Sequence, residues 1–167
     1  MDPRLSMIFA RRSVRAYTQQ PVSADDIHGL LEAGMAAPSA NNHKPWHFVV
    51  VRNRDALHML AEMLPYGKML EGAALAIAVC GDPSASDWWV QDCAAATENI
   101  LVAAAGLGLG SVWVGCHGRA QREDAVRSIL GIPARIGVLS LVSLGHPAER
   151  KQSRTQYEEA RVHWERY

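Results

Sequence analysis

The sequence has no excess of positive or negative charge. Among its 167 residues, 17 lysines and arginines balance 17 aspartates and glutamates, so the formal net charge is zero. Proteins that bind nucleic acid through their overall charge need a basic excess, which is missing here. We therefore expect no nucleic-acid partner, although a local basic site is compatible with this balance.

Cysteine and long apolar segments are scarce as well. Cys80, Cys93 and Cys116 form no Cys-x-x-Cys pair, so neither a zinc site nor a disulfide framework is indicated. Residues 1–5 contain no apolar signal-peptide core. The longest stretch without a charged residue, 99–118, is interrupted by five glycines, which favour a buried helix, a turn and a strand over a membrane span. We expect a reduced, cytoplasmic protein with no metal and no membrane partner.

Apolar sequence is present in the amount that one globular domain over residues 1–167 needs, since 49% of the chain is hydrophobic. Ser23 and Asp26 resemble a capping box that opens a helix, and Pro38 ends it. The apolar stripe of this helix is Ile27, Leu30, Leu31 and Met35. Periodicity predicts further helices over 5–9, 54–64, 87–105 and 121–130, and strands over 47–51, 73–80, 111–114 and 136–144.

Three glycines, Gly106, Gly108 and Gly110, resemble a dinucleotide-binding fingerprint. They follow a helical pattern instead of a strand, and Ser111 stands where a further glycine is expected. We therefore reject a Rossmann fold.

Basic residues gather near the N-terminus, in the run Arg-Arg-Ser-Val-Arg at 11–15. In an extended segment Arg11, Ser13 and Arg15 share one face. Two guanidinium groups with a hydroxyl between them suit a phosphate, because each can bind two oxygens. A solvated basic loop is the alternative.

Two further segments have the composition of binding loops. Residues 37–46 hold amides, a hydroxyl, a lysine and a histidine between two prolines, although an ordinary surface turn is equally compatible. Residues 115–118 place a Cys-His pair between glycines, so a flat ligand can approach the backbone. Neighbours in sequence rarely have nucleophile–base geometry, so we do not favour Cys116 as a nucleophile. The charged tail, 148–167, has few aliphatic residues but contains three aromatics, and we expect it to dock on another copy of the chain.

Taken in order, these motifs resemble those of the nitroreductase family of flavin-dependent oxidoreductases, in its compact version. The motifs are RRSVR at 11–15, APSANNHKPW at 37–46, GLGSVWVG at 108–115, LGHPAE at 144–149 and the tail from residue 157 to 164. The resemblance implies an α+β fold with a central, mostly antiparallel sheet flanked by helices. It also implies a homodimer that exchanges C-terminal segments and binds FMN at its interface.

Site residues follow from the same resemblance. The FMN phosphate and ribityl chain would be held by Arg11, Ser13 and Arg15. The loop contributed by the other subunit would be represented by Pro38, Ser39, Ala40 and Asn42. The segment against the isoalloxazine ring would be Val114, Gly115 and Cys116, where a backbone N–H typically faces flavin N5.

Two positions depart from the family pattern. Lys44 replaces a frequent glutamine, and a lysine near the flavin pyrimidine edge would favour the anionic reduced flavin. Arg154 falls where a family lysine binds phosphate, while Gln156 falls where arginine is frequent. With glutamine at position 156, one charged contact to the FMN phosphate would be lost, and Arg12 and Lys151 are two possible substitutes for it.

The implied reaction is a ping-pong transfer of hydride from NADH or NADPH, through flavin N5, to a nitroaromatic, quinone or similar small oxidant. The flavin does the chemistry, so no side chain needs to be a general acid. His43, Lys44 and His117 are the residues to test in that role. The alternatives are a non-catalytic FMN-binding or storage protein, a flavin-dependent dehalogenase of the same fold, and a phosphate-binding protein without flavin.

Overall fold

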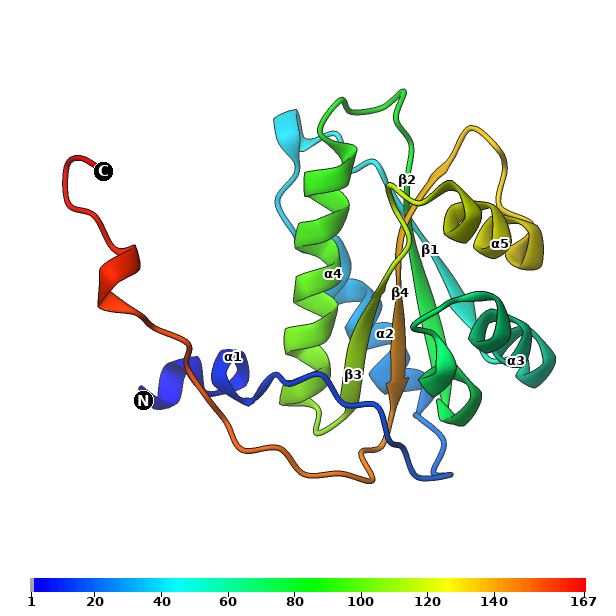
Figure 1. Cartoon of the computed structure of the whole chain (residues 1–167), viewed down its shortest axis with the longest axis horizontal. Helices are drawn as coiled ribbons and strands as arrows, with labels where there is room; N and C mark the ends of the chain where they lie inside the picture. Colours follow the sequence, from blue (N-terminus) through cyan, green and yellow to red (C-terminus); the bar gives the residue numbers. More distant parts are fainter. Residues whose placement is uncertain (1) are drawn as a thin grey trace.

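A computed structural model describes residues 2–167 of the chain (Figure 1). Its α-helices are α1 (Ser6–Ala10), α2 (Ala24–Met35), α3 (Arg54–Met63), α4 (Trp89–Gly106) and α5 (Ala120–Leu130). Its strands are β1 (Trp46–Val51), β2 (Leu75–Gly81), β3 (Gly110–Gly115) and β4 (Gly137–Gly145). Short 3-10 turns occupy Pro3–Leu5, Ala40–Asn42, Lys68–Gly72 and Glu159–Arg161.

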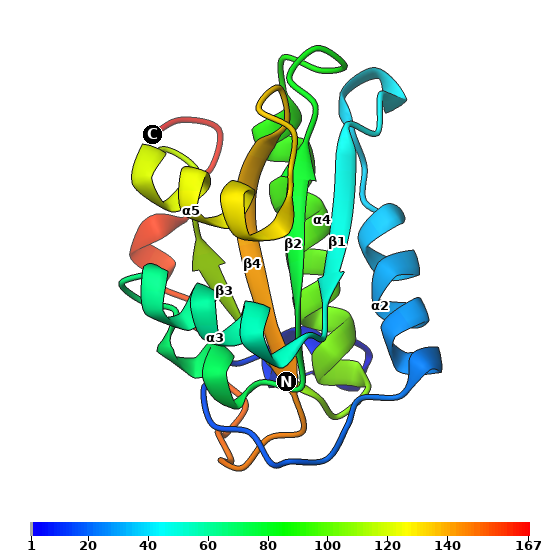
Figure 2. The same cartoon turned by 90° about the vertical axis from the view of Figure 1, so that its right-hand side faces the viewer.

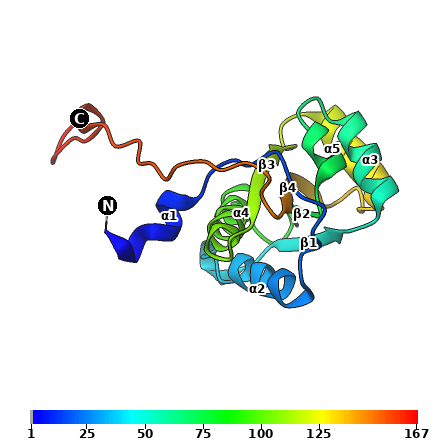
Figure 3. The ribbon, with the colours of Figure 1, turned by 90° about the horizontal axis from the view of Figure 1, so that it is seen from below.

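The four strands form one sheet in the order β1-β2-β4-β3, and every neighbouring pair is antiparallel. Helices α2 and α4 cover one face of this sheet, and α3 and α5 cover the other (Figures 2 and 3). The short helix α1 packs against α4. This is the expected α+β architecture.

The two central strands are buried on both faces. Along β2, Ile77 and Val79 join the core beneath α2 and α4, whereas Ala76, Ala78 and Cys80 join the core beneath α3 and α5. A strand buried on both sides needs apolar residues at every position, which explains the unbroken apolar run of β2. Helix α4 is rich in alanine, and these small side chains let it lie close to the sheet.

Local signals predicted these elements well. The Ser23 hydroxyl accepts a hydrogen bond from the Asp26 amide at 3.0 Å and caps α2, and Gly131, at φ 66°, ends α5. The stripe predicted for α2 is wrong at Met35, whose side chain is 55% exposed. Its neighbour Gly34 meets α4 instead, because a Cβ there would lie only 3.0 Å from Ile100.

Residues 99–118 divide between α4, a tight turn and β3, as expected from their glycines. Within residues 2–167, no helix combines the length and apolarity that crossing a membrane requires.

The chain leaves the sheet after β4 as an extended tail (Figures 1 and 3). It runs past α1, where the Arg154 amide donates to the Phe9 carbonyl at 3.1 Å. Beyond Lys151 every tail residue is exposed, including Trp164 at 80%. Met7 and Ile8 of α1 are exposed as well. The tail and α1 therefore leave apolar surface uncovered in a single chain.

Candidate functional site

The basic stretch runs along the outer edge of β3. Ser13 forms a parallel bridge with Ser111, and the Val14 amide donates to the Ser111 carbonyl at 2.9 Å. Val14 is buried against Gly110, where an added Cβ would lie 2.6 Å from its Cγ1. Arg12 and Val14 line one hollow of about 280 Å³, whereas Arg15 lines different ones. The hollow shared by Arg12 and Val14 fits the expected alternation, but Ala16, which the alternation places on their side, lines a hollow with Arg15 instead.

The three arginines of the stretch have different partners. Arg11 lies 3.4 Å from the Glu98 carboxylate on α4, and Arg12 donates to the Gln152 carbonyl in the tail. Arg15 has no carboxylate within ion-pair distance of its guanidinium among the described residues, although its amide donates to Glu149 at 2.7 Å. Of the three guanidinium groups, that of Arg15 is the one with no protein partner among the described residues, so it is available to a ligand.

Lys151 supports the stretch from the start of the tail. Its ammonium donates to the Ser13 carbonyl at 2.5 Å and lies 3.2 Å from Glu149. Both Lys151 and Arg12 line the 280 Å³ hollow. Arg154 lies farther along the tail and is exposed. Arg12 and Lys151, the two possible substitutes for a phosphate contact, thus line one hollow, whereas Arg154 does not line it.

A hollow of about 440 Å³ joins Arg15 to the end of β3. Its lining is Arg15, Tyr66, Lys68, Met69, Val112, Trp113, Val114 and Gly115. Gly115 is exposed there, and a Cβ added to it would meet only Trp113 Nε1, at 4.0 Å. Lys68 has no ion-pair partner among residues 2–167. The hollow therefore combines two free cations with an open stretch of backbone.

Sequence reasoning missed Tyr66, Lys68 and Met69. Tyr66 lies between Pro65 and Gly67 in the connection after α3, a composition typical of turns, and Lys68 and Met69 begin the 3-10 turn Lys68–Gly72 that follows. This composition predicts a turn at Tyr66, but only the fold brings Lys68 and Arg15 to one hollow.

A β-bulge fixes the segment after β3. The register between β2 and β4 shifts between Val79 and Cys80, and the extra residue is Leu139. Its carbonyl accepts the amides of both Cys116 and His117 at 3.0 Å. Bulges often lie beside binding sites because they re-aim a short piece of chain. Here the bulge anchors the residues directly after Gly115.

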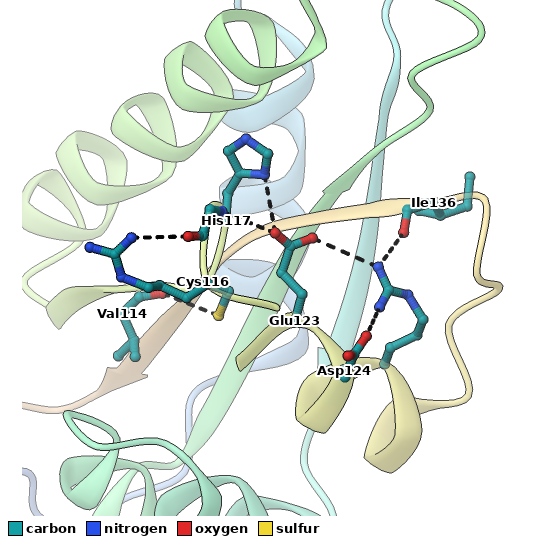
Figure 4. A network of polar contacts seen from close by, with 9 residues as sticks. Val114, Cys116, His117, Glu123, Asp124 and Ile136 are labelled. Carbon is teal, nitrogen blue, oxygen red and sulfur yellow. Dashed lines mark hydrogen bonds and ion pairs between the residues drawn. The ribbon is translucent and has the colours of Figure 1, made fainter. Parts of the chain in front are cut away.

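Glu123 of α5 holds the same segment from the other side (Figure 4). Its Oε1 accepts from the Gly118 amide at 3.0 Å and lies 3.3 Å from His117 Nδ1. His117 also meets the Trp89 ring edge-on, with centroids 4.9 Å apart. Since His117 is held by these contacts and does not line the 440 Å³ hollow, its geometry is that of a positioning residue.

Cys116 is fully buried and does not line the hollow, although Val114 and Gly115 do. Burial raises the pKa of its thiol to about 12, so the thiolate needed for nucleophilic attack is not formed at neutral pH. The structure supports no nucleophilic role for Cys116.

The polar loop 37–46 lies against the first turn of α4. The Ala40 amide donates to Asp92 Oδ1 at 2.9 Å, and the Ser86 hydroxyl donates to Asp92 Oδ2 at 2.9 Å. The Lys44 amide donates to the Ser39 hydroxyl at 3.0 Å. Sequence reasoning missed Asp92, the buried acid on a helix face whose other buried residues are apolar apart from Thr97. These bonds fix the backbone of the loop.

The loop presents its polar side chains outward. Asn41, Asn42 and Lys44 have φ values of 49°, 59° and 49°. Non-glycine residues rarely adopt this left-handed conformation, and it clusters at binding sites. Asn42, His43 and Lys44 are all exposed. The loop is thus a rigid, strained surface.

One chain keeps the two predicted halves of the site apart. The loop lies at the N-terminal end of α4, whereas residues 11–15 cross near its C-terminal end (Figure 1). The helix has 18 residues, so its ends are about 27 Å apart.

Comparison with known proteins agrees with this architecture. The sequence profile of the Nitroreductase family matches residues 8–66 and 53–146. The chain belongs to the nitroreductase family and is an oxidoreductase.

The relatives match over the whole chain. A protein of Archaeoglobus fulgidus with the provisional name NADH dehydrogenase/NAD(P)H nitroreductase is 48% identical, with 100% of each sequence covered. A Bacteroides thetaiotaomicron structure of the same provisional name is 41% identical, with a TM-score of 0.97 over 100% of this chain and 99% of the other. A Desulfovibrio desulfuricans protein, provisionally named a nitroreductase and solved with FMN, is 32% identical, with a TM-score of 0.84 over 100% and 99%.

Proposed function

We propose that this protein is an FMN-dependent oxidoreductase that carries electrons from NADH or NADPH to a nitroaromatic, quinone or similar small oxidant. The observation that carries the proposal is the 440 Å³ hollow, in which Arg15 and Lys68 lie beside the exposed backbone of Gly115. The FMN-containing relative supports it.

The residues of this hollow fit FMN. The uncompensated guanidinium of Arg15 suits the phosphate, since a planar fork binds two oxygens at once. Val114 and Gly115 offer backbone without a bulky side chain, against which the ring can lie. Lys68 adds a cation that favours negative charge on the bound group. When bound, FMN supplies the chemistry of accepting hydride at N5 and passing it to the oxidant.

The chain's own residues bind and orient. The Leu139 carbonyl and Glu123 hold residues 116–118, so the backbone at Gly115 keeps one position. Such preorganisation lowers the cost of aligning two reactants on one face of a ring. We assign no general acid, and His43, Lys44 and His117 stay the residues to test.

The working unit that we propose is a homodimer. A second copy would bring its 37–46 loop, with Pro38, Ser39, Ala40, Asn42 and Lys44, to the hollow of the first. The tail, with Arg154, would cross to the partner and cover apolar surface that one chain leaves exposed, such as Trp164. Arg11 and Ser13 would then complete the phosphate site beside Arg15.

The test is a titration of the purified protein with FMN, followed by steady-state oxidation of NADH and NADPH with a quinone and with a nitroaromatic. We expect tight FMN binding and turnover with at least one donor. FMN binding without turnover would indicate a storage protein. Turnover only with a halogenated substrate would indicate a dehalogenase. No FMN binding at all would overturn the proposal and leave a phosphate-binding protein.

A further inference from the structure

We propose that the hollow between the end of α3 and the start of α5 binds the adenosine phosphate end of the electron donor, and that Arg119 there selects NADPH over NADH. The inference rests on the proposed function, because it names the donor of that reaction.

This hollow measures about 370 Å³. Its lining is Met63, Pro65, Gly118, Arg119, Ala120, Gln121 and Arg122. Its volume lies within the range of small-molecule sites, about 300–1,000 Å³. Helices α3 and α5 lie on the sheet face away from α1 and the tail of the same chain, so neither of these segments covers the hollow (Figure 3). It therefore has the size and access that a soluble ligand needs.

The hollow adjoins the FMN site that we propose. The Arg122 guanidinium lies 5.4 Å from the centre of the Tyr66 ring and donates to the Gly115 carbonyl at 3.3 Å. Tyr66 and Gly115 line the 440 Å³ hollow, whereas Arg122 lines the 370 Å³ hollow. The two hollows thus share one wall. A ligand with a flat ring in the first hollow and a phosphate in the second would cross this wall, and NAD(P)H has that form.

The charges of the second hollow favour an anion. Neither Arg119 nor Arg122 has a carboxylate within ion-pair distance among the described residues, and no acidic residue lines the hollow. The carboxylate of nearby Glu123 is occupied by the Gly118 amide, His117 and Arg127. A ligand that enters this hollow therefore contacts two guanidinium groups whose charge no carboxylate balances.

The same charges discriminate between the two donors. Sites for NADH commonly use an acidic residue to bind the ribose 2′-hydroxyl, whereas an arginine accommodates the 2′-phosphate of NADPH. Arg119 is exposed at the rim, and its guanidinium donates only to the adjacent Gly118 carbonyl, at 3.0 Å. It is free to turn toward a phosphate, while Arg122 is held at the shared wall.

The experiment is a calorimetric titration of the FMN-loaded protein with adenosine 2′,5′-bisphosphate, which lacks the nicotinamide and cannot reduce the flavin. The variants are Arg119→Ala and Arg119→Lys, and the control is Arg52→Ala, at an exposed arginine outside both hollows. A hydrogen bond to a charged group contributes about 1.5–3 kcal/mol, which corresponds to about 10–150-fold in affinity. We expect a loss of that size in Arg119→Ala, a smaller loss in Arg119→Lys, and none in the control.

A second readout uses the donors themselves. The ratio of NADPH to NADH in flavin reduction at subsaturating donor should fall about tenfold or more in Arg119→Ala. Equal bisphosphate affinity in Arg119→Ala and Arg52→Ala, or no bisphosphate binding, would overturn the inference while leaving the oxidoreductase intact. Should the protein bind no FMN, the proposed function fails, and the same titration on the purified protein still decides whether the hollow takes the phosphate.

Discussion

At the scale of single residues, Arg15 differs from its neighbours in being the arginine of the 11–15 stretch whose guanidinium is left free. Arg11 is partly neutralised by Glu98, and Arg12 is engaged by the tail. All three arginines belong to one basic motif in the sequence. Their partners differ because Glu98 on α4 and Gln152 in the tail, both distant in sequence, lie beside Arg11 and Arg12.

Arg15→Ala should weaken FMN binding by about 10–150-fold, because it removes a charged hydrogen-bond donor from the phosphate. Quenching of flavin fluorescence measures the dissociation constant. Arg52→Ala, at an exposed arginine outside the hollow, is the matched control. An Arg15→Ala protein that binds FMN as tightly as the control would remove Arg15 from the site.

The buried thiols predict how stability depends on pH. Burial raises the pKa of Cys80 to about 11 and those of Cys93 and Cys116 to about 12, from an ordinary value near 9. Above pH 9 the unfolded chain therefore loses protons that the folded chain keeps, which favours unfolding. We expect the free energy of unfolding to fall between pH 9 and pH 11 in urea titrations.

The control for this prediction is the Cys93→Ala variant, which should show a shallower fall over the same pH range. A wild-type stability that is constant from pH 8 to pH 11 would contradict the burial of these thiols. Tyr17 adds to the same trend, since burial raises its pKa to about 12.

At the scale of elements, close packing at the end of the sheet decides stability. Gly81 and Gly137 are cross-strand partners on β2 and β4, and the Trp89 ring covers both. A Cβ at Gly137 would lie 2.4 Å from that ring, and one at Gly81 would lie 2.5 Å from it. The same tryptophan contacts His117, so the packing also supports the segment after β3.

Gly137→Ala should destabilise the protein by about 1–3 kcal/mol, because a rigid indole must move. Gly29→Ala is the matched control, since a Cβ at that helical glycine meets nothing within 4 Å. It should stabilise the protein by about 0.5–1 kcal/mol through helix propensity. Thermal denaturation of both variants measures the difference, and equal melting temperatures would contradict this account of Trp89.

Local signals predicted the elements because caps, prolines and periodicity act within a few residues. Ser23 and Gly131 fix the ends of their helices wherever those helices pack. Met35 was misplaced because burial on α2 depends on where α4 approaches, at Gly34. Lys68 and Asp92 could not be found from local sequence, since each gains its role from a partner segment distant in the chain.

At the scale of the whole molecule, the proposed site is incomplete without a second copy. The 37–46 loop and the 11–15 stretch lie at opposite ends of α4, and the tail leaves Trp164 80% exposed. The organisation as one domain over residues 1–167, the cytoplasmic setting and the exchange of tails stay predictions.

Removing residues 152–167 should convert the proposed dimer to a monomer and abolish tight FMN binding, while the sheet and its helices stay folded. Light scattering gives the mass, and circular dichroism checks the fold. The single substitution Trp164→Ala should weaken the dimer without removing the Arg154 cation. A truncated protein that is dimeric and binds FMN normally would show that the tail has another role.

The central claim is that this chain binds FMN and reduces it with a nicotinamide donor. The most direct measurement is an anaerobic titration of the FMN-loaded protein with NADPH and with NADH, followed by the visible absorbance of the oxidised flavin. The account predicts complete bleaching by about one equivalent of NADPH per FMN, and recovery of the colour on adding a quinone. A bound flavin that neither donor bleaches would contradict it.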